Sequence, residues 1–156
     1  MYKVYLGLGT NLGNRKHNIR EAIDKIGEQI GVVKRQSALY ETEPWGYSSP
    51  NYYINACVLV LTEMAPRQVL EATQKIEREM GRTMKSVDGE YFDRIIDIDI
   101  LLIDDLKIDE PDFKIPHPLM EERVPCLPYR SSRPSCRFPS AVCPMSCPIP
   151  LHAIVI

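Results

Sequence analysis

The sequence lacks the features that mark membrane proteins, secreted proteins and nucleic-acid-binding proteins. None of its apolar runs approaches the roughly 20 residues that cross a bilayer, and its N-terminus does not have the basic, apolar and small-residue order of a signal peptide. The formal net charge is −2, so no basic excess favours a nucleic acid as partner. A hydrophobic share of 44% and a charged share of 26% are typical of a globular domain. We therefore expect a cytoplasmic protein with no membrane or nucleic-acid partner.

Neither of the common glycine-rich nucleotide-binding motifs is present. Gly7 and Gly9 lie in a predicted strand, but the next glycine, Gly13, comes one place too late for the pattern G-x-G-x-x-G. No G-x-x-x-x-G-K motif occurs anywhere in the chain. We therefore do not expect a dinucleotide-binding fold or a P-loop.

Cysteine is scarce before Val124, and acidic residues are absent from there onward. One of the five cysteines, Cys57, precedes this point, whereas all 21 Asp and Glu residues do. The four later cysteines, at positions 126, 136, 143 and 147, form no Cys-x-x-Cys pair of the kind that binds zinc. We interpret residues 124–156 as a Pro/Cys-rich tail without helical or strand periodicity, following a domain over residues 1–123.

Hydrophobic periodicity predicts alternating strands and helices. The expected helices cover roughly residues 16–30 and 66–80, and the second has Gln74, Glu77 and Arg78 on an accessible face. Strands are expected at residues 3–9, 32–40, 52–61 and 94–102. The order strand–helix–strand occurs twice along the chain. It indicates an α+β fold, a ferredoxin-like αβα sandwich with a mainly antiparallel sheet.

Asp97 and Asp99 form the centre of the candidate site. On a strand they point from one face, while Ile96, Ile98, Ile100 and Leu102 point from the other. Two adjacent carboxylates repel each other, but Mg²⁺ accepts such oxygen ligands and bridges them to substrate phosphates. The alternative is an exposed strand whose acids are merely solvated.

Further candidates support phosphoryl chemistry, which needs cations around acids in a site that excludes water. An aromatic side chain beside an amide, Tyr53 and Asn55, could bind a flat heterocycle, although ordinary packing is an alternative. Residues 43–50 and 82–93 are polar stretches of the kind that close over ligands, or plain connections. The cationic and imidazole candidates are Arg82, Lys85, Arg94, Arg123 and His117.

Six ordered motifs carry a family resemblance that covers residues 3–123. They are Gly9-Thr10-Asn11-Leu12-Gly13, Tyr40-x-Thr42-x-Pro44-x-Gly46, Tyr53-x-Asn55-x-x-Val58, Gln74-x-Ile76-Glu77-x-x-x-Gly81-Arg82, Arg94-x-x-Asp97-x-Asp99-Ile100-Leu101 and Pro116-His117-Pro118-x-Met120-x-x-Arg123. With these motifs the chain resembles the hydroxymethyl-dihydropterin pyrophosphokinases of folate biosynthesis.

The resemblance implies transfer of pyrophosphate from the co-substrate ATP to 6-hydroxymethyl-7,8-dihydropterin, with release of AMP. It implies that Asp97 and Asp99 bind two Mg²⁺ ions and that Arg82 and Arg94 are catalytic with them. By the same likeness, the ATP site comprises Gln74, Glu77, Arg82, Lys85, Arg94, Ile100, His117 and Arg123. The pterin site comprises Gly9, Thr42, Pro44, Trp45, Tyr53 and Asn55. The expected protein is a monomer or weak dimer.

The resemblance breaks after Arg123. The family continues with an aromatic residue that completes the pterin pocket, but Pro125 stands in its place, with Tyr129 or Phe138 as substitutes. A shifted reading of the codons from Pro125 to Ser135 permits Leu-Ser-Pro-Leu-Ser-Glu-Phe-Ala-Pro-Glu, close to the family segment. We therefore hypothesise that the tail is read out of frame, with a genuine divergent tail as the alternative. A catalytically impaired member that binds nucleotide or pterin only is the alternative function.

Overall fold

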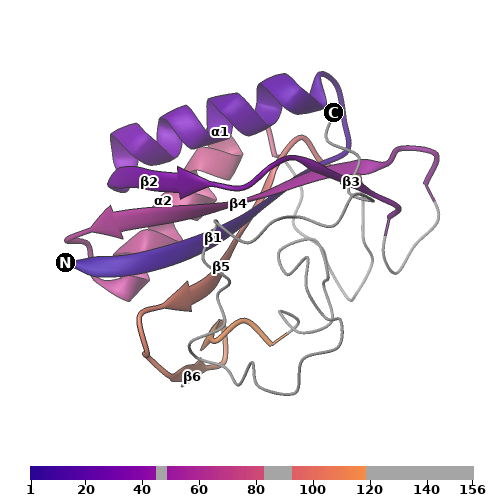
Figure 1. The fold of residues 1–156 in the computed structure, drawn as a ribbon. Coiled ribbons are helices and arrows are strands. Elements are labelled where there is room, and N and C mark those ends of the chain that lie inside the picture. Colours follow the sequence, from indigo (N-terminus) through magenta and orange to yellow (C-terminus); the bar gives the residue numbers. More distant parts are fainter. Residues whose placement is uncertain (45–48, 83–92, 119–156) are drawn as a thin grey trace, which may run out of the picture.

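The computed structural model describes residues 1–44, 49–82 and 93–118 of the 156-residue chain. The elements follow the predicted order of strands and helices (Figure 1). They are β1 (Tyr2–Thr10), α1 (Arg15–Gln29), β2 (Val32–Gln36), β3 (Tyr40–Thr42), β4 (Tyr53–Thr62), α2 (Pro66–Glu79), β5 (Asp97–Ile103), β6 (Ile108–Glu110) and β7 (Phe113–Ile115).

The main sheet is antiparallel, and β1 lies inside it. The strand order is β2–β4–β1–β5, and β3 also pairs with β4. β2 pairs with the second half of β4 and β3 with its first half, so the two short strands follow one edge of β4 in succession. This topology confirms the predicted α+β fold of ferredoxin-like type.

Helices α1 and α2 cover one face of the sheet, where the hydrophobic core forms (Figure 1). Alternate residues of the strands, such as Leu6, Val58 and Ile98, point into this core and meet Ile26 of α1 and Ile76 of α2. The described residues thus form two of the three layers of an αβα sandwich, namely the sheet and one layer of helices. The other side chains of β1, β4 and β5 occupy the opposite face, where the predicted site residues lie.

Local sequence signals set the ends of the helices. The Asn14 side chain accepts a hydrogen bond of 3.2 Å from the His17 backbone N–H, which caps α1. Gly31 follows α1, and a Cβ atom at this position would lie 2.2 Å from the Leu61 carbonyl oxygen. Gly81 follows α2 with a φ of +94°, a conformation that favours glycine. These ends agree with the predicted helices to within one residue.

The predicted strand over residues 32–40 is interrupted, which corrects the sequence-based expectation. The structure has two strands there, β2 and β3, with a break between them at residues 37–39. At Ser37 the side chain takes part in the pairing with β4. The Ser37 hydroxyl accepts a hydrogen bond of 2.9 Å from the Cys57 N–H, while the Ser37 N–H donates one of 2.8 Å to the Cys57 carbonyl. A side-chain oxygen thus takes the place of a backbone carbonyl, which periodicity does not reveal.

A second correction concerns Leu102, which was expected to share a face with Ile100. The register moves from Leu6 opposite Ile100 to Tyr5 opposite Leu102, so Leu101 is an extra residue in a β-bulge. Leu101 and Leu102 therefore pack with Tyr5 and Cys57 in a separate cluster, and Ile103 enters the main core instead.

Beyond β5 the chain forms a small hairpin of β6 and β7 that the sequence analysis did not predict. Arg67 of α2 pairs with Glu110 and Asp112 and lies 5.5 Å from the centre of the Phe113 ring. These contacts attach the hairpin to the first turn of α2.

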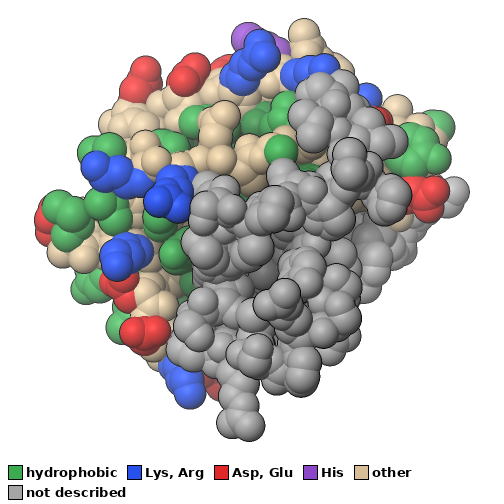
Figure 2. All heavy atoms as spheres, viewed as in Figure 1, with side chains coloured by type: hydrophobic (Ala, Val, Ile, Leu, Met, Phe, Trp, Pro, Cys, Tyr) green, Lys and Arg blue, Asp and Glu red, His purple; other side chains and the backbone are tan. Residues whose placement is uncertain are grey.

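Acidic and basic side chains are interspersed over the described part of the visible surface (Figure 2). Within residues 1–44, 49–82 and 93–118, neither helix is long and apolar enough to cross a lipid bilayer.

Candidate active site

Two glycines of β1 form the floor between the two halves of the candidate site. Gly9 pairs with Asn55 of β4 on one side and with Asp97 of β5 on the other. Gly7 pairs in the same way with Cys57 and Asp99. The sequence analysis excluded these glycines from a dinucleotide-binding motif. In the sheet they leave the strip between β4 and β5 without side chains.

The amide of Asn55 is fixed on the β4 side of this floor. Its Nδ2 donates a hydrogen bond of 2.8 Å to the Thr42 hydroxyl on β3. A Cβ atom at Gly9 would lie 3.2 Å from the Asn55 Oδ1 and 3.6 Å from the Tyr53 ring, so a side chain there would press against both. The structure therefore brings together four of the predicted pterin-binding residues, and the hydrogen bond from β3 sets the orientation of the amide. The four are Gly9, Thr42, Tyr53 and Asn55.

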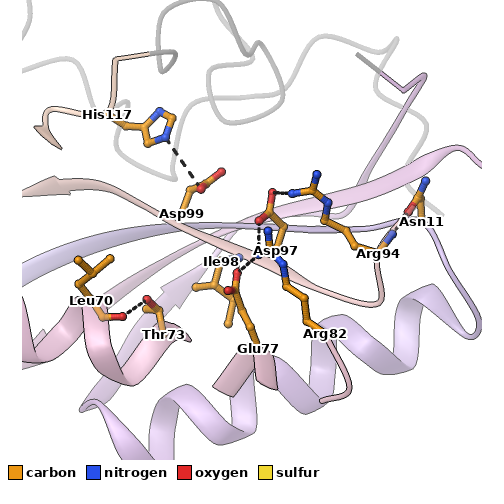
Figure 3. A network of polar contacts seen from close by, with 10 residues as sticks. All are labelled: Asn11, Leu70, Thr73, Glu77, Arg82, Arg94, Asp97, Ile98, Asp99 and His117. Atoms are coloured by element: carbon orange, nitrogen blue, oxygen red, sulfur yellow. Dashed lines mark hydrogen bonds and ion pairs between the residues drawn. The ribbon is translucent and has the colours of Figure 1, made fainter. Parts of the chain in front are cut away.

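Two arginines converge on Asp97 (Figure 3). The Arg82 guanidinium lies 2.7 Å from Asp97 Oδ1, and the Arg94 guanidinium lies 3.0 Å from Oδ2. Burial is the largest single influence on Arg94 and would lower its pKa, but attraction to Asp97, Tyr53 and Asp99 and the hydrogen bond to Asp97 together outweigh it and raise the pKa. Arg94 therefore stays charged beside the carboxylate, as the chemistry of a phosphate-binding site requires.

Glu77 is buried, which corrects the expectation that it lies on an accessible face of α2. Its side chain points toward β5 (Figure 3), and the residue is 9% exposed. One carboxylate oxygen accepts hydrogen bonds of 2.8 Å from the Ile98 N–H and 2.5 Å from Arg82. Burial raises the pKa of Glu77, although Arg82 and the Ile98 N–H oppose this shift. Glu77 therefore links α2, Arg82 and β5.

Asp99 and His117 extend the acid–arginine cluster along β5. His117 Nε2 lies 3.9 Å from Asp99 Oδ1, on the same side of β5 as Asp97 (Figure 3). The His117 N–H donates a hydrogen bond of 3.0 Å to the Leu101 carbonyl, which holds the imidazole near the strand. The structure thus brings His117 to the predicted metal-binding face from a segment 18 residues downstream of Asp99 in the sequence.

Other predicted residues lie at the margin of this cluster or outside the described ranges. Gln74 is half-buried on α2, one turn before Glu77, and Pro44 is half-buried after β3. The Ile100 side chain lies in the hydrophobic core, on the face of β5 away from Asp97 and Asp99. Three predicted residues fall outside the described ranges: Trp45, Lys85 and Arg123.

A polar network beside Arg94 was missed by the sequence analysis. Asp93 accepts hydrogen bonds from Asn11, Ser49 and Asn51, and the Asn11 amide also contacts the Arg94 backbone. Asn11 lies in one of the quoted motifs and directly follows the buried end of β1, which is the available signal. Asp93 carried no such signal, because its partners are more than 40 residues away in the sequence.

The carboxylates of Asp97 and Asp99 fit a divalent metal in their chemistry. Among the described residues, no group of three or more His, Cys, Asp or Glu side chains is placed to bind a metal ion. Asp97 and Asp99 supply hard oxygen ligands on one face. Mg²⁺ commonly takes one or two carboxylates and completes its shell with water and substrate phosphates. A two-carboxylate set is therefore suited to this ion.

Comparison with known proteins places the sequence in one family. Residues 5–127 match the family model for 7,8-dihydro-6-hydroxymethylpterin-pyrophosphokinase (HPPK). A Porphyromonas gingivalis protein named 2-amino-4-hydroxy-6-hydroxymethyldihydropteridine pyrophosphokinase is 46% identical over 121 residues, covering 77% of this chain and 82% of that protein. The Bacillus subtilis protein of the same name is 37% identical over 121 residues, covering 77% of this chain and 71% of that protein.

The fold is similar to that of solved structures from the same family. A crystal structure of Plasmodium falciparum HPPK-DHPS with pteroate matches with a TM-score of 0.53 and 19% identity, covering 69% of this chain. This chain spans 30% of that longer chain, and at this identity the likeness shows the fold alone. The family model covers most of the sequence and both relatives exceed 30% identity, so the chain belongs to the 7,8-dihydro-6-hydroxymethylpterin-pyrophosphokinase family.

Proposed function

We propose that this chain transfers the pyrophosphoryl group of ATP to 6-hydroxymethyl-7,8-dihydropterin in folate biosynthesis, at the site between β4 and β5. The hydroxymethyl oxygen forms a bond to the β-phosphorus, and the bond from that phosphorus to the oxygen shared with the α-phosphate breaks. AMP leaves with this oxygen and its electron pair, and the hydroxyl proton goes to solvent. One observation carries the proposal: an arginine-paired carboxylate on β5 and an oriented amide on β4 lie on either side of β1, across its bare glycine floor.

The β4 side is suited to the pterin. Asn55 can exchange hydrogen bonds with the ring edge, because Thr42 already sets the direction of its amide. Tyr53 offers an aromatic face, and Gly9 lets a flat ring approach the sheet backbone. We propose that Pro44 and Trp45 extend this wall.

The β5 side is suited to the triphosphate. Asp97 and Asp99 would hold two Mg²⁺ ions, which supply positive charge to the phosphate oxygens. Arg82 and Arg94 would stabilise the negative charge that develops during transfer, since guanidinium groups bind phosphate with fixed geometry. Glu77 holds Arg82 in this position through the short contact described above.

We propose further residues for the remaining ATP contacts. His117 is close to Asp99 and is suited to a phosphate oxygen. We assign the rest of the nucleotide to Gln74, Ile100, Lys85 and Arg123. Because ATP is the co-substrate, we further propose a cytoplasmic location and a monomer or weak dimer as the working form.

We also propose that residues 1–123 form the catalytic domain and that the tail over residues 124–156 arises from an out-of-frame reading. The nucleotide sequence tests this directly. The idea fails if the shifted frame after codon 124 does not encode an apolar segment containing Pro-Leu and Ala-Pro.

A coupled assay for AMP tests the proposed reaction. The full chain is incubated with ATP, Mg²⁺ and 6-hydroxymethyl-7,8-dihydropterin, and each component is omitted in turn. We expect AMP only in the complete mixture and none after addition of EDTA. AMP release without pterin, or pterin and ATP binding without AMP, would contradict the proposal.

A further inference from the structure

The carboxylate of Asp93 joins two segments that lie far apart in the sequence. Its Oδ2 accepts hydrogen bonds of 2.6 Å from the Asn51 amide and 3.0 Å from the Ser49 hydroxyl. Its Oδ1 accepts a hydrogen bond of 2.7 Å from the Asn11 amide. Hydrogen bonds to an ionised group are stronger than those between neutral groups. One side chain thus connects the end of β1 with the segment that leads into β4.

Asn11 continues this connection to Arg94. Its Oδ1 accepts a hydrogen bond of 2.8 Å from the Arg94 N–H, and its own N–H donates one of 3.2 Å to the Arg94 carbonyl (Figure 3). The Asn11 amide also reaches the Asn51 carbonyl at 3.3 Å. Asn11 is 2% exposed, so these partly buried contacts are shielded from water on the Asn11 side. The backbone of Arg94 is therefore held on both sides by one buried residue.

These contacts lie between the two halves of the site. Asn51 precedes Tyr53 and Asn55 by two and four residues, on the pterin side. Arg94, whose guanidinium pairs with Asp97, follows Asp93 directly on the phosphate side. A displacement of Asp93 would therefore move the start of β4 and the Arg94 backbone together.

We propose that Asp93 is a positioning residue that fixes the pterin wall and Arg94 relative to each other. It touches neither substrate and acts through Asn11 and Asn51. The inference rests on the proposed function, because it assigns Asp93 a role in the geometry of that reaction. Its chemical requirement is specific: one member of the Asp93–Asn51 pair must be a carboxylate and the other an amide.

A charge exchange tests this requirement. N51D places a second carboxylate against Asp93, and the two repel each other. D93N in the same chain restores one acid and one amide with their positions exchanged, while the amide oxygen at position 93 still accepts from Asn11. We expect N51D to lower kcat/KM for the pterin at least about tenfold, since a hydrogen bond to a charged group is lost. The D93N/N51D double variant should return to within about threefold of the wild type.

The kinetic constants separate positioning from general stability. N51D should lower kcat, because Arg94 is displaced, and raise KM for the pterin, because the start of β4 moves. Q36E is the matched control, since it adds the same charge at an exposed position of β2; its constants should equal those of the wild type. Thermal unfolding followed by circular dichroism accompanies each variant. If N51D does not fold, recovery of both folding and kcat in D93N/N51D still tests the exchange.

The outcomes distinguish this inference from the proposed function. A wild-type protein that releases no pterin-dependent AMP contradicts the proposed function itself. An active wild type with a double variant as impaired as N51D, or more so, overturns the role of Asp93 alone. A change in unfolding temperature without any change in kcat or KM would also overturn it.

Discussion

Replacement of Glu77 by glutamine removes a charge from the most buried carboxylate of the site while keeping its shape. The glutamine oxygen can still accept from the Ile98 N–H and from Arg82, so both contacts keep their acceptor. Burial raises the pKa of Glu77, which means that the ionised form is less favourable in the folded chain than in the unfolded chain. The glutamine imitates the protonated form at every pH.

The sign of the pH dependence follows from this raised pKa. The stability that protonated Glu77 contributes is complete below the unfolded value of 4.5 and is lost as the pH rises through the folded value. The E77Q variant keeps this contribution to stability at every pH, because glutamine does not ionise. Each unit by which the pKa is raised corresponds to about 1.4 kcal/mol in favour of the variant above the folded pKa. For a domain of this size, 1 kcal/mol changes Tm by about 2–8 °C.

Urea unfolding at pH 4.5 and pH 8 measures this difference. We expect the free energy of unfolding of E77Q minus that of the wild type to be larger at pH 8 than at pH 4.5. E71Q is the matched control, because it makes the same substitution at an exposed position of the same helix. A difference for E77Q that is independent of pH, or smaller at pH 8, would refute the argument from burial.

E77Q should lower the catalytic activity, although it raises the stability of the folded chain. The bond from Arg82 to a neutral oxygen is about half as strong as its bond to a carboxylate. A loss of about 1 kcal/mol in positioning Arg82 lowers kcat about fivefold. E77Q with wild-type kcat would show that Glu77 does not hold Arg82 for the reaction.

Asp97→Ala and Asp99→Ala should each lower AMP release at least about a thousandfold, because several kcal/mol of metal-derived charge stabilisation are lost; circular dichroism should show an intact fold, and retained turnover would contradict the metal assignment. Asn55→Ala should raise the Kd for the pterin about 5- to 100-fold, as a hydrogen bond is removed. Calorimetry with an ATP analogue should show less than a twofold change, and an equal loss for both ligands would contradict the pterin assignment. Gly31→Ala should lower the free energy of unfolding by about 1–3 kcal/mol, since its Cβ atom meets a β4 carbonyl. Gly27→Ala is the control, because no neighbouring atom lies within 4 Å of the added Cβ, and an equal response at both positions would contradict this prediction.

The elements that depend on local patterns could be predicted from the sequence. Val69, Thr73, Ile76 and Met80 of α2 are all buried, and their spacing is the repeat of three to four residues from which the helix over residues 66–80 is predicted. The pairing of Tyr53 with Asn55 on one face of β4 follows from strand alternation in the same way.

The features that depend on distant contacts could not be predicted. The bulge at Leu101 arises where β1 and β5 lose register, and nothing in either strand alone marks it. Glu77 resembles a surface residue in the sequence, because its partner, the Ile98 N–H, lies on another element. The Ile100 side chain also lies on the core face of β5, away from Asp97 and Asp99, and the roles assigned to the predicted site residues stay predictions.

In the proposed arrangement, the glycine floor of β1 would set the distance between the two substrates. Neighbouring strands are about 4.8 Å apart, so β4 and β5 are roughly 10 Å apart across Gly9. That span is maintained by the backbone ladder, which contains no rotatable side chain. Substitutions that keep this ladder intact would therefore alter the affinity for either substrate without changing the distance between β4 and β5 at the floor. A slip of β1 by one residue would instead reverse its faces and put the Leu8 side chain where the glycine floor lies. That side chain would stand between the proposed pterin and triphosphate sites.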